Sequence, residues 1–207
     1  ADARAPPAEV PCAVSAAISS RGRAAQWEEA LALFDASGRG GSQSLRCYTA
    51  AIGACGRGLQ VGFALRLLRA MRPRRLEPNA VAYNAALSGL EARGRWAEAL
   101  AVLDAMRAVG VRPDIVTFGA AVGACARRGL WQCAASLFGD LQSAGLSPNI
   151  VICASLASAC DKGNAWPRAV AMLDAMTSLR LGHGLVALHA ALRACSLAAS
   201  WRSAMLV

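Results

Sequence analysis

Apolar residues recur along most of this chain with the spacing of amphipathic helices. Tyr83, Ala86, Leu87 and Leu90 stand at i, i+3, i+4 and i+7, which places them on one face of a helix. A polar break follows, and residues 96–106 form a second apolar stripe with similar spacing. The same two stripes return 35 residues later, so the pattern predicts a repeated helical hairpin.

Single side chains mark the period of the repeat. Trp96, Trp131, Trp166 and Trp201 are each 35 residues apart, and Trp27 lies 69 residues before Trp96. Other residues in constant phase are Pro78, Pro113, Pro148, Ala30, Ala64, Ala99, Ala134, Ala169 and Ala204. Because the tryptophans begin the second stripe, we expect Trp131 to pack between hairpins. Full burial there would make Trp131→Ala cost about 3–5 kcal/mol.

Short turns separate the units. Gly110 and Pro113 end a second helix, and the side chain of Asp114 is suited to cap the next first helix. We place the repeats after a lead-in at 1–9, at about 10–43, 44–78, 79–113, 114–148, 149–183 and, in part, 184–207. One hairpin cannot bury both stripes alone, so the chain is predicted to be an all-α α-solenoid. Neither end carries a polar cap, and we expect a segment of a longer array.

The composition favours helices over strands. Alanine, the best helix former, supplies 48 of the 207 residues, whereas aromatic residues make up only 5%. This balance argues against an all-β domain.

The chain is strongly basic. It has 22 basic and 13 acidic residues, a net charge of +9, and Lys162 is the only lysine. Such a charge favours anionic partners such as nucleic acid. GC-rich coding would also produce an excess of arginine and alanine. The placement of the arginines along the repeat must therefore decide whether the positive charge serves binding.

No segment is predicted to span a membrane. The longest uncharged run, 141–160, is interrupted by polar residues and Pro148 in its first half. The opening residues ADARAPPAEVP are rich in alanine and proline, and no targeting peptide is visible in this segment.

The cysteines and histidines do not form a recognisable catalytic or metal pattern. Cys55, Cys125, Cys160 and Cys195 share one repeat phase on the apolar face of the first helix, where small buried residues are expected. No CxxC motif occurs, and His183 and His189 are the only histidines. We therefore expect no enzyme activity, no metal and no cofactor in this segment.

The units 81–114 (VAYNAALSGLEARGRWAEALAVLDAMRAVGVRPD) and 116–149 resemble pentatricopeptide repeats of the pure 35-residue type. The resemblance covers about 10–207 and is strongest in 44–149. The Pro-Asp and Pro-Asn junctions and the strict 35-residue period favour this family over the 34-residue tetratricopeptide repeats. The resemblance implies a right-handed superhelix that binds single-stranded RNA, one base per repeat, in mitochondria or chloroplasts.

In the family, base choice depends on the residue after the aromatic of the first helix, together with the residue after the junction proline. The resemblance therefore implies three RNA base-reading pairs, Thr49 with Asn79, Asn84 with Asp114, and Gly119 with Asn149. The first pair is associated with adenine and the second with uracil, which predicts a preference for 5′-AU-3′. Glycine offers no side chain in the third pair. The pairs Ser15 with Ser44 and Ala154 with Gly184 depart from the pattern.

The family also sandwiches each base between branched apolar side chains three residues before the reader. By resemblance these are Val81, Val116, Val151 and Val186, with Arg46 in the second repeat and Cys12 in the first repeat. Ordinary helix packing is the alternative role for the valines.

A basic residue recurs about eight residues after the reader. These residues are Arg23, Arg57, Arg93, Arg127 and Lys162, with Arg93 one place late. A basic stripe in this phase is suited to tracking phosphates, although a solvated surface would also carry arginines.

Two further interpretations stay open. Solenoids of helical hairpins also serve as protein-interaction scaffolds, so a longer array could bind protein partners. The array could also be the RNA-targeting arm of an enzyme whose catalytic domain lies elsewhere.

Overall fold

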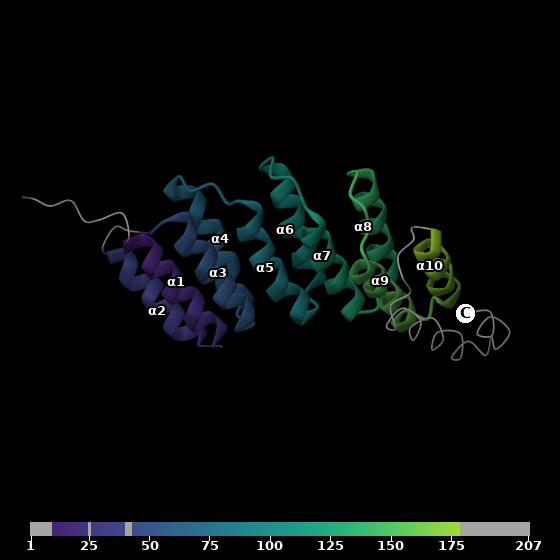
Figure 1. The fold of residues 1–207 in the computed structure, drawn as a ribbon, viewed down its shortest axis with the longest axis horizontal. Helices are drawn as coiled ribbons and strands as arrows, with labels where there is room; N and C mark the ends of the chain where they lie inside the picture. Colours follow the sequence, from purple (N-terminus) through teal and green to yellow (C-terminus); the bar gives the residue numbers. More distant parts are fainter. Residues whose placement is uncertain (1–9, 25, 40–42, 179–207) are drawn as a thin grey trace, which may run out of the picture. The chain divides into compact units, whose positions relative to one another are not determined.

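The computed structural model describes residues 10–24, 26–39 and 43–178. These residues form ten α-helices and one short 3₁₀ helix, and no strand occurs among them (Figure 1). The helices are α1 Val10–Arg23, α2 Trp27–Arg39, α3 Leu45–Arg57, α4 Val61–Met71, η1 Arg72–Arg74, α5 Ala80–Arg93, α6 Trp96–Ala108, α7 Ile115–Arg127, α8 Trp131–Ser143, α9 Ile150–Lys162 and α10 Trp166–Ser178. The predicted all-α class is confirmed. None of the helices in the described ranges has the length and apolar character needed to cross a bilayer.

Part of what the repeat pattern predicts lies outside the described residues. This applies to the lead-in at 1–9, the sixth repeat at 184–207 and the loop residues 40–42. It applies equally to Trp201, Ala204, Cys195, His183, His189, Gly184 and Val186.

The chain divides into two compact units, Ala1–Leu90 and Glu91–Val207, which we call unit 1 and unit 2. The division falls within α5. In unit 1, α1 packs against α2 and α3, and α3 packs against α4. In unit 2, α7 packs against α6, α8 and α9, and α9 packs against α10. Within each unit, a first helix thus lies beside its own second helix and beside the next first helix.

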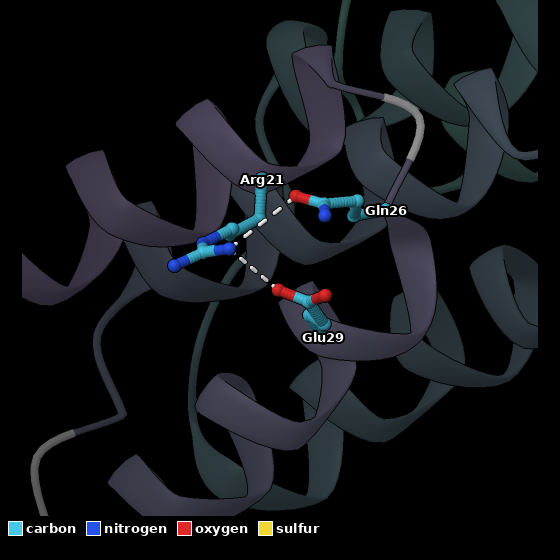
Figure 2. Close-up of polar contacts among 3 residues, drawn as sticks. All are labelled: Arg21, Gln26 and Glu29. Carbon is cyan, nitrogen blue, oxygen red and sulfur yellow. Dashed lines mark hydrogen bonds and ion pairs between the residues drawn. The ribbon is translucent and has the colours of Figure 1, made fainter.

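In unit 1, α2 packs against α3 through apolar side chains and is joined to α1 by polar contacts. Phe34 of α2 meets the ring of Tyr48 edge-on, with ring centroids 4.8 Å apart, and both side chains are buried. Figure 2 shows Arg21 of α1 reaching the start of α2, where its Nη1 donates to Glu29 Oε2 at 2.6 Å and to Gln26 Oε1 at 3.4 Å. Arg21 and Glu29 are both about half exposed, so this pair adds little stability.

The residues expected in the core are buried. The repeat-phase alanines Ala30, Ala64, Ala99, Ala134 and Ala169 are all at most 1% exposed. Cys55, Cys125 and Cys160 are buried as well, which confirms the packing role predicted for their phase. Small side chains at these points allow neighbouring helices to approach closely.

Polar side chains cap the N-termini of first helices, as was predicted for Asp114. Asp114 Oδ1 accepts from Thr117 N at 2.8 Å, and Asp114 N donates to Thr117 Oγ1 in a capping box. Asn79 accepts from Ala82 N at 3.0 Å, and Asn149 accepts from Ile152 N at 2.9 Å. These caps satisfy backbone donors that a helix start leaves open.

Tryptophans begin several second helices, and Trp96 and Trp131 are less buried than full packing between hairpins would make them. Trp27, Trp96, Trp131 and Trp166 are the first residues of α2, α6, α8 and α10. Trp131 is half-buried, and Trp96 is 36% exposed. The indole of Trp131 lies against Gly163 at the end of α9, and Arg168 covers its ring. In the preceding repeat, the position of Gly163 is occupied by Arg128, which lies near Trp96. The Nε of Arg128 donates to Gly94 O at 3.3 Å.

Candidate nucleic-acid interface

A groove of about 600 Å³ runs along the first helices of unit 1. It is lined by α1, α3 and the beginning of α5. Its polar lining includes Ser15, Ser19, Arg23, Arg46, Thr49, Arg57 and Asn79. None of the described residues that line it is acidic. The groove is thus open to an anionic ligand with hydrogen-bonding groups.

Thr49 and Asn79, one of the predicted base-reading pairs, meet in this groove. The hydroxyl of Thr49 donates to Leu45 O at 2.9 Å within α3, so its oxygen is left to accept from a ligand. Asn79 uses Oδ1 to cap α5, which leaves its Nδ2 hydrogens as donors. The bond of Thr49 within α3 and the capping bond of Asn79 therefore leave the pair with one acceptor and one donor group for a ligand.

The valines predicted to sandwich bases are on the surface. Val81, Val116 and Val151 are 61%, 57% and 64% exposed. Ordinary core packing, the alternative role for these residues, would bury them. Each is the second residue of its first helix, and Val81 lines the unit 1 groove. An exposed branched residue in constant phase marks this edge of the helices as a surface for apolar contact.

The predicted basic stripe coincides with the ends of the first helices. Arg23, Arg57, Arg93, Arg127 and Lys162 are the last residues of α1, α3, α5, α7 and α9, and all are exposed. Basic residues at helix C-termini also complement the helix dipole, so helix stabilisation accounts for part of this pattern.

Arg57 is the most constrained of these residues. Its Nε donates to Gly22 O at 3.0 Å, which joins α3 to the end of α1. A side chain at Gly22 would collide with the guanidinium, and Gly53 borders it on the other side. Partial burial and the nearby charge of Arg23 lower the pKa of Arg57 from its usual value. Two guanidinium groups are thus held close together at this end of the groove.

The corresponding arginine of unit 2 has an acidic neighbour. Glu91 is half-buried, and its carboxylate occupies the space that a side chain at Gly123 would take on α7. Burial raises the pKa of Glu91, and the positive charge of Arg127 opposes this rise. Arg127 therefore faces a carboxylate, whereas the described part of the groove lining around Arg57 contains none.

The other predicted readers have varied settings. In unit 2, Gly119 is half-buried on α7, and Asn149 is exposed and caps α9 through Oδ1. Asp114 caps α7, and Asn84 is half-buried in the part of α5 that belongs to unit 1. A methyl group at Gly119 would lie 3.7 Å from Cγ1 of Ile152, which is ordinary van der Waals contact. Packing therefore leaves room for a small side chain at this reader position.

One polar residue of the groove, Ser19, was not among the residues named from the sequence. Ser19 lies four residues after Ser15, in a phase where the later first helices carry Gly53, Ser88, Gly123 and Ser158. The uniform small size at this phase is the signal that could have identified it. Arg46, which was named with the sandwiching residues, stands where the next three repeats carry valine, and it lines the groove.

The thiols are poorly suited to chemistry. Burial raises the pKa of Cys55, Cys125 and Cys160 to about 11, so each is protonated at neutral pH. Within the described ranges, no group of three or more His, Cys, Asp and Glu side chains is placed to hold a metal.

Comparison with known families decides the assignment. A model of the PPR repeat family matches residues 78–127, and a PPR repeat model matches residues 116–146. Residues 78–146 of the chain are therefore pentatricopeptide repeats. No curated protein sequence matches it.

Solved pentatricopeptide repeat structures share the fold. The chain is similar to PPR10 in complex with an 18-nt psaJ RNA element, with 25% identity, a TM-score of 0.66 and coverage of 92% of this chain. It spans about a third (33%) of that protein. The PPR domain of Arabidopsis thaliana protein-only RNase P 1 in complex with tRNA matches with 18% identity and a TM-score of 0.72, over 93% of this chain and 98% of that one. A. thaliana proteinaceous RNase P 2 matches with 14% identity and a TM-score of 0.67, over 81% and 38%. The predicted α-solenoid is confirmed.

Proposed function

We propose that this protein binds single-stranded RNA along the face formed by its first helices. The observation that carries the proposal is the unit 1 groove, where the Thr49–Asn79 pair, the exposed Val81 and three arginines line one cavity whose described lining residues include no acidic side chain. The relatives PPR10 and protein-only RNase P 1, both solved with RNA, support this assignment. The proposed activity is binding alone.

The groups in the groove match the edge of a base. Adenine presents an amine donor beside a ring-nitrogen acceptor, which complements the Thr49 oxygen and the Asn79 amide. Asn84 with Asp114 is the proposed uracil reader of the next repeat, so 5′-AU-3′ is the proposed preferred step. Reading of one base per repeat, and a role in organellar RNA processing, stability or translation, belong to the same proposal and follow from the family.

Fluorescence anisotropy with labelled single-stranded RNA, measured over a salt series, tests the proposal. RNA containing AU steps should bind more tightly than RNA in which each AU is replaced by CC. The logarithm of the affinity should fall linearly with the logarithm of the salt concentration, by about 0.7 for each phosphate that is neutralised. Asn79→Asp is a sharp variant because aspartate preserves the α5 cap but removes the amide donor. It should lose the preference for adenine and keep the helix content.

Absence of salt-dependent RNA binding by a folded chain would overturn the proposal.

A protein-interaction scaffold is the other function considered, and Phe63 gives it one specific support. This ring on α4 is 39% exposed, lies 6.1 Å from the ring of Trp27 and is covered on one face by Arg66. Exposed aromatic side chains of this kind are common at protein interfaces. If the array is the targeting arm of an enzyme, RNA binding is still required of it.

A further inference from the structure

A second pocket, of about 270 Å³, opens at the edge of unit 2 where first helices turn into second helices. One side is the turn that enters α6, and the other side is the turn between α7 and α8. Its lining includes Gly94, Arg95, Trp96, Glu98, Arg128 and Leu130. None of these residues belongs to the predicted base-reading, sandwiching or phosphate-binding sets, so the proposed reading of bases does not account for the pocket.

The pocket lies where an arginine takes the place of a glycine. In the next repeat, Gly163 lies so close to the indole of Trp131 that a Cβ on it would come within 2.5 Å of the ring carbon Cδ1. Gly58 lies equally close to a tryptophan in unit 1. Arg128 occupies this repeat phase beside Trp96, and its side chain keeps the turn from closing on the ring. The indole of Trp96 is consequently 36% exposed at the pocket wall.

The charge of Arg128 is available to a ligand. Its Nε donates to Gly94 O at 3.3 Å, which uses one of the five N–H groups of the guanidinium. The side chain is exposed, and none of the ion pairs formed among the described residues involves it. Arg95, on the opposite side of the pocket, is by contrast paired with Glu98. The pocket therefore offers one aromatic face and one unopposed cation.

These two groups together suit a nucleotide. An exposed indole stacks on nucleobases, whichever base is present, because every base has a π-face. A guanidinium binds phosphate oxygens through charge-assisted and often paired hydrogen bonds. Cationic rings are disfavoured, because the positive charge of Arg128 repels them. A volume of about 270 Å³ lies near the lower end of the range for small-molecule pockets, about 300–1,000 Å³, which suits one ring system.

The basic stripe leads to this pocket. Arg93 and Arg127 are the last residues of α5 and α7, and they immediately precede Gly94 and Arg128 in the chain. An RNA strand whose phosphates follow the stripe through unit 2 would pass beside Trp96. One of its nucleotides could then place its base in the pocket without being read for sequence.

We infer that this pocket binds one nucleotide unit, with the base against the indole of Trp96 and the phosphate at the guanidinium of Arg128. The inference goes beyond the proposed function, because the pocket lies outside the groove that holds the Thr49–Asn79 pair. A nucleotide of a bound RNA strand and a free nucleotide share this chemistry. Only the RNA source rests on the proposed function.

The test compares the complete chain with the variants Trp96→Leu, Arg128→Gln and Trp131→Leu. Leucine removes the ring but keeps an apolar side chain, and Trp131→Leu is the matched control because Gly163 and Arg168 cover that ring. Adenosine, adenosine 5′-monophosphate and phenyl phosphate are titrated by calorimetry and by quenching of tryptophan fluorescence. Labelled single-stranded RNA is titrated by anisotropy. Circular dichroism checks that each variant keeps its helix content.

Trp96→Leu should weaken the binding of adenosine and of adenosine 5′-monophosphate about 10-fold each, because both stack through the base. Arg128→Gln should weaken the monophosphate about 3- to 5-fold and leave adenosine unchanged, because only the monophosphate carries the anion. Trp131→Leu should bind both ligands like the unmodified chain. For RNA, Trp96→Leu should cost about 5-fold and Trp131→Leu much less.

Three results would overturn the inference while the proposed function stands. In the first, RNA binds and neither it nor the monophosphate responds to Trp96→Leu. In the second, Arg128→Gln weakens adenosine as much as the monophosphate, which would make Arg128 purely structural. In the third, phenyl phosphate binds as tightly as the monophosphate, which would assign the pocket to aromatic acids of a protein partner.

The two ligand sources give different results. Binding of RNA that depends on Trp96, without binding of the free monophosphate, would identify the RNA strand as the source. Binding of the monophosphate that depends on Trp96, in a chain that binds no RNA at low salt, would support the pocket and overturn the proposed function. Failure of the unmodified chain to bind either ligand would overturn both.

Discussion

Units 1 and 2 repeat the same hairpin, but they differ in their turns. In unit 2 the left-handed turn positions are held by Gly94, Gly129, Gly110 and Gly145, with Asn164 as the one exception among the described turns of that unit. In unit 1 the corresponding positions are Leu59 and Arg75, with φ of 57° and 58°. A side chain in this region costs roughly 1–2 kcal/mol relative to glycine. Turns of unit 1 are therefore strained where those of unit 2 are mostly relaxed.

The two units also differ in how they surround an arginine of the basic stripe. Arg57 lies between Gly22 and Gly53, beside Arg23, in a groove with no carboxylate among its described lining residues. Arg127 faces the half-buried Glu91. A residue in the same repeat phase can thus have opposite electrostatic neighbours. Repeat phase locates a side chain on the helix, and the neighbouring helix determines the field around it.

The difference between the turns can be tested by placing leucine, the residue of the Leu59 turn in unit 1, at the matching glycine of unit 2. Gly129→Leu should lower the free energy of unfolding by about 2–4 kcal/mol, from backbone strain and from overpacking. A Cβ at Gly129 would lie 3.0 Å from the Cβ of Lys162. Chemical denaturation measures the change. The reverse variant Leu59→Gly should raise stability by about 1 kcal/mol, and a loss on that exchange would refute the strain argument.

The tryptophans sharpen the comparison within unit 2. Because Trp131 is half-buried, Trp131→Ala should cost about 1.5–3 kcal/mol, below the range for full burial. Trp96→Ala should cost less, about 1 kcal/mol, since Trp96 is 36% exposed. Urea unfolding curves of the two variants give both values. Equal losses of unfolding free energy in the two variants would mean that the exposure of the tryptophan does not determine its contribution to stability.

The arginines test the electrostatic difference directly. Arg57→Gln should weaken RNA binding about 10-fold and reduce the salt slope by about 0.7, because it removes a positive charge that no carboxylate among the described groove residues offsets. Arg127→Gln should change both much less, because Glu91 already offsets its charge. The same anisotropy titrations measure both variants. Thermal melting serves as the control for Arg57→Gln, since its bond to Gly22 O is also lost. A larger effect at Arg127 than at Arg57 would contradict the comparison.

Glu91→Gln should produce the smallest change, and in the opposite direction. Removing the carboxylate releases Arg127, so RNA affinity at neutral pH and low salt should rise about 2- to 3-fold. The variant Glu98→Gln, at an exposed ion pair with Arg95, is a charge-matched control and should raise affinity less. Loss of RNA affinity in Glu91→Gln would show that the carboxylate supports binding.

The same residue gives a pH dependence. Folding raises the pKa of Glu91 above 4.5, so the folded state holds this proton more tightly than the unfolded state. The cost of the buried carboxylate is present at neutral pH and is relieved as pH falls through the raised pKa. The melting temperature of Glu91→Gln should therefore exceed that of the unmodified chain at pH 7, with a gap that narrows toward about pH 4.5.

Much of the fold and most of the polar residues of the candidate site were predictable because they depend on local spacing. The Asp114 cap is a contact between residues three apart, and the buried phase of Cys125 follows from helical periodicity. The predicted pair Thr49 and Asn79 does line one groove. Trp131 was expected in a more buried setting, because periodicity indicates which face a side chain occupies and not how far the next hairpin covers it.

The sequence by itself determined the repeat, the helix pairs, their caps and the phase of the basic and apolar positions, since each depends on residues a few places apart in one helix or on the 35-residue period. Tertiary structure alone decided which side chains meet across helices. Arg57 reaches Gly22 O across 35 residues, and Glu91 fills the space at Gly123 beside Arg127. These contacts depend on the register of one helix against the next, which side-chain volume and burial set only when both helices are packed.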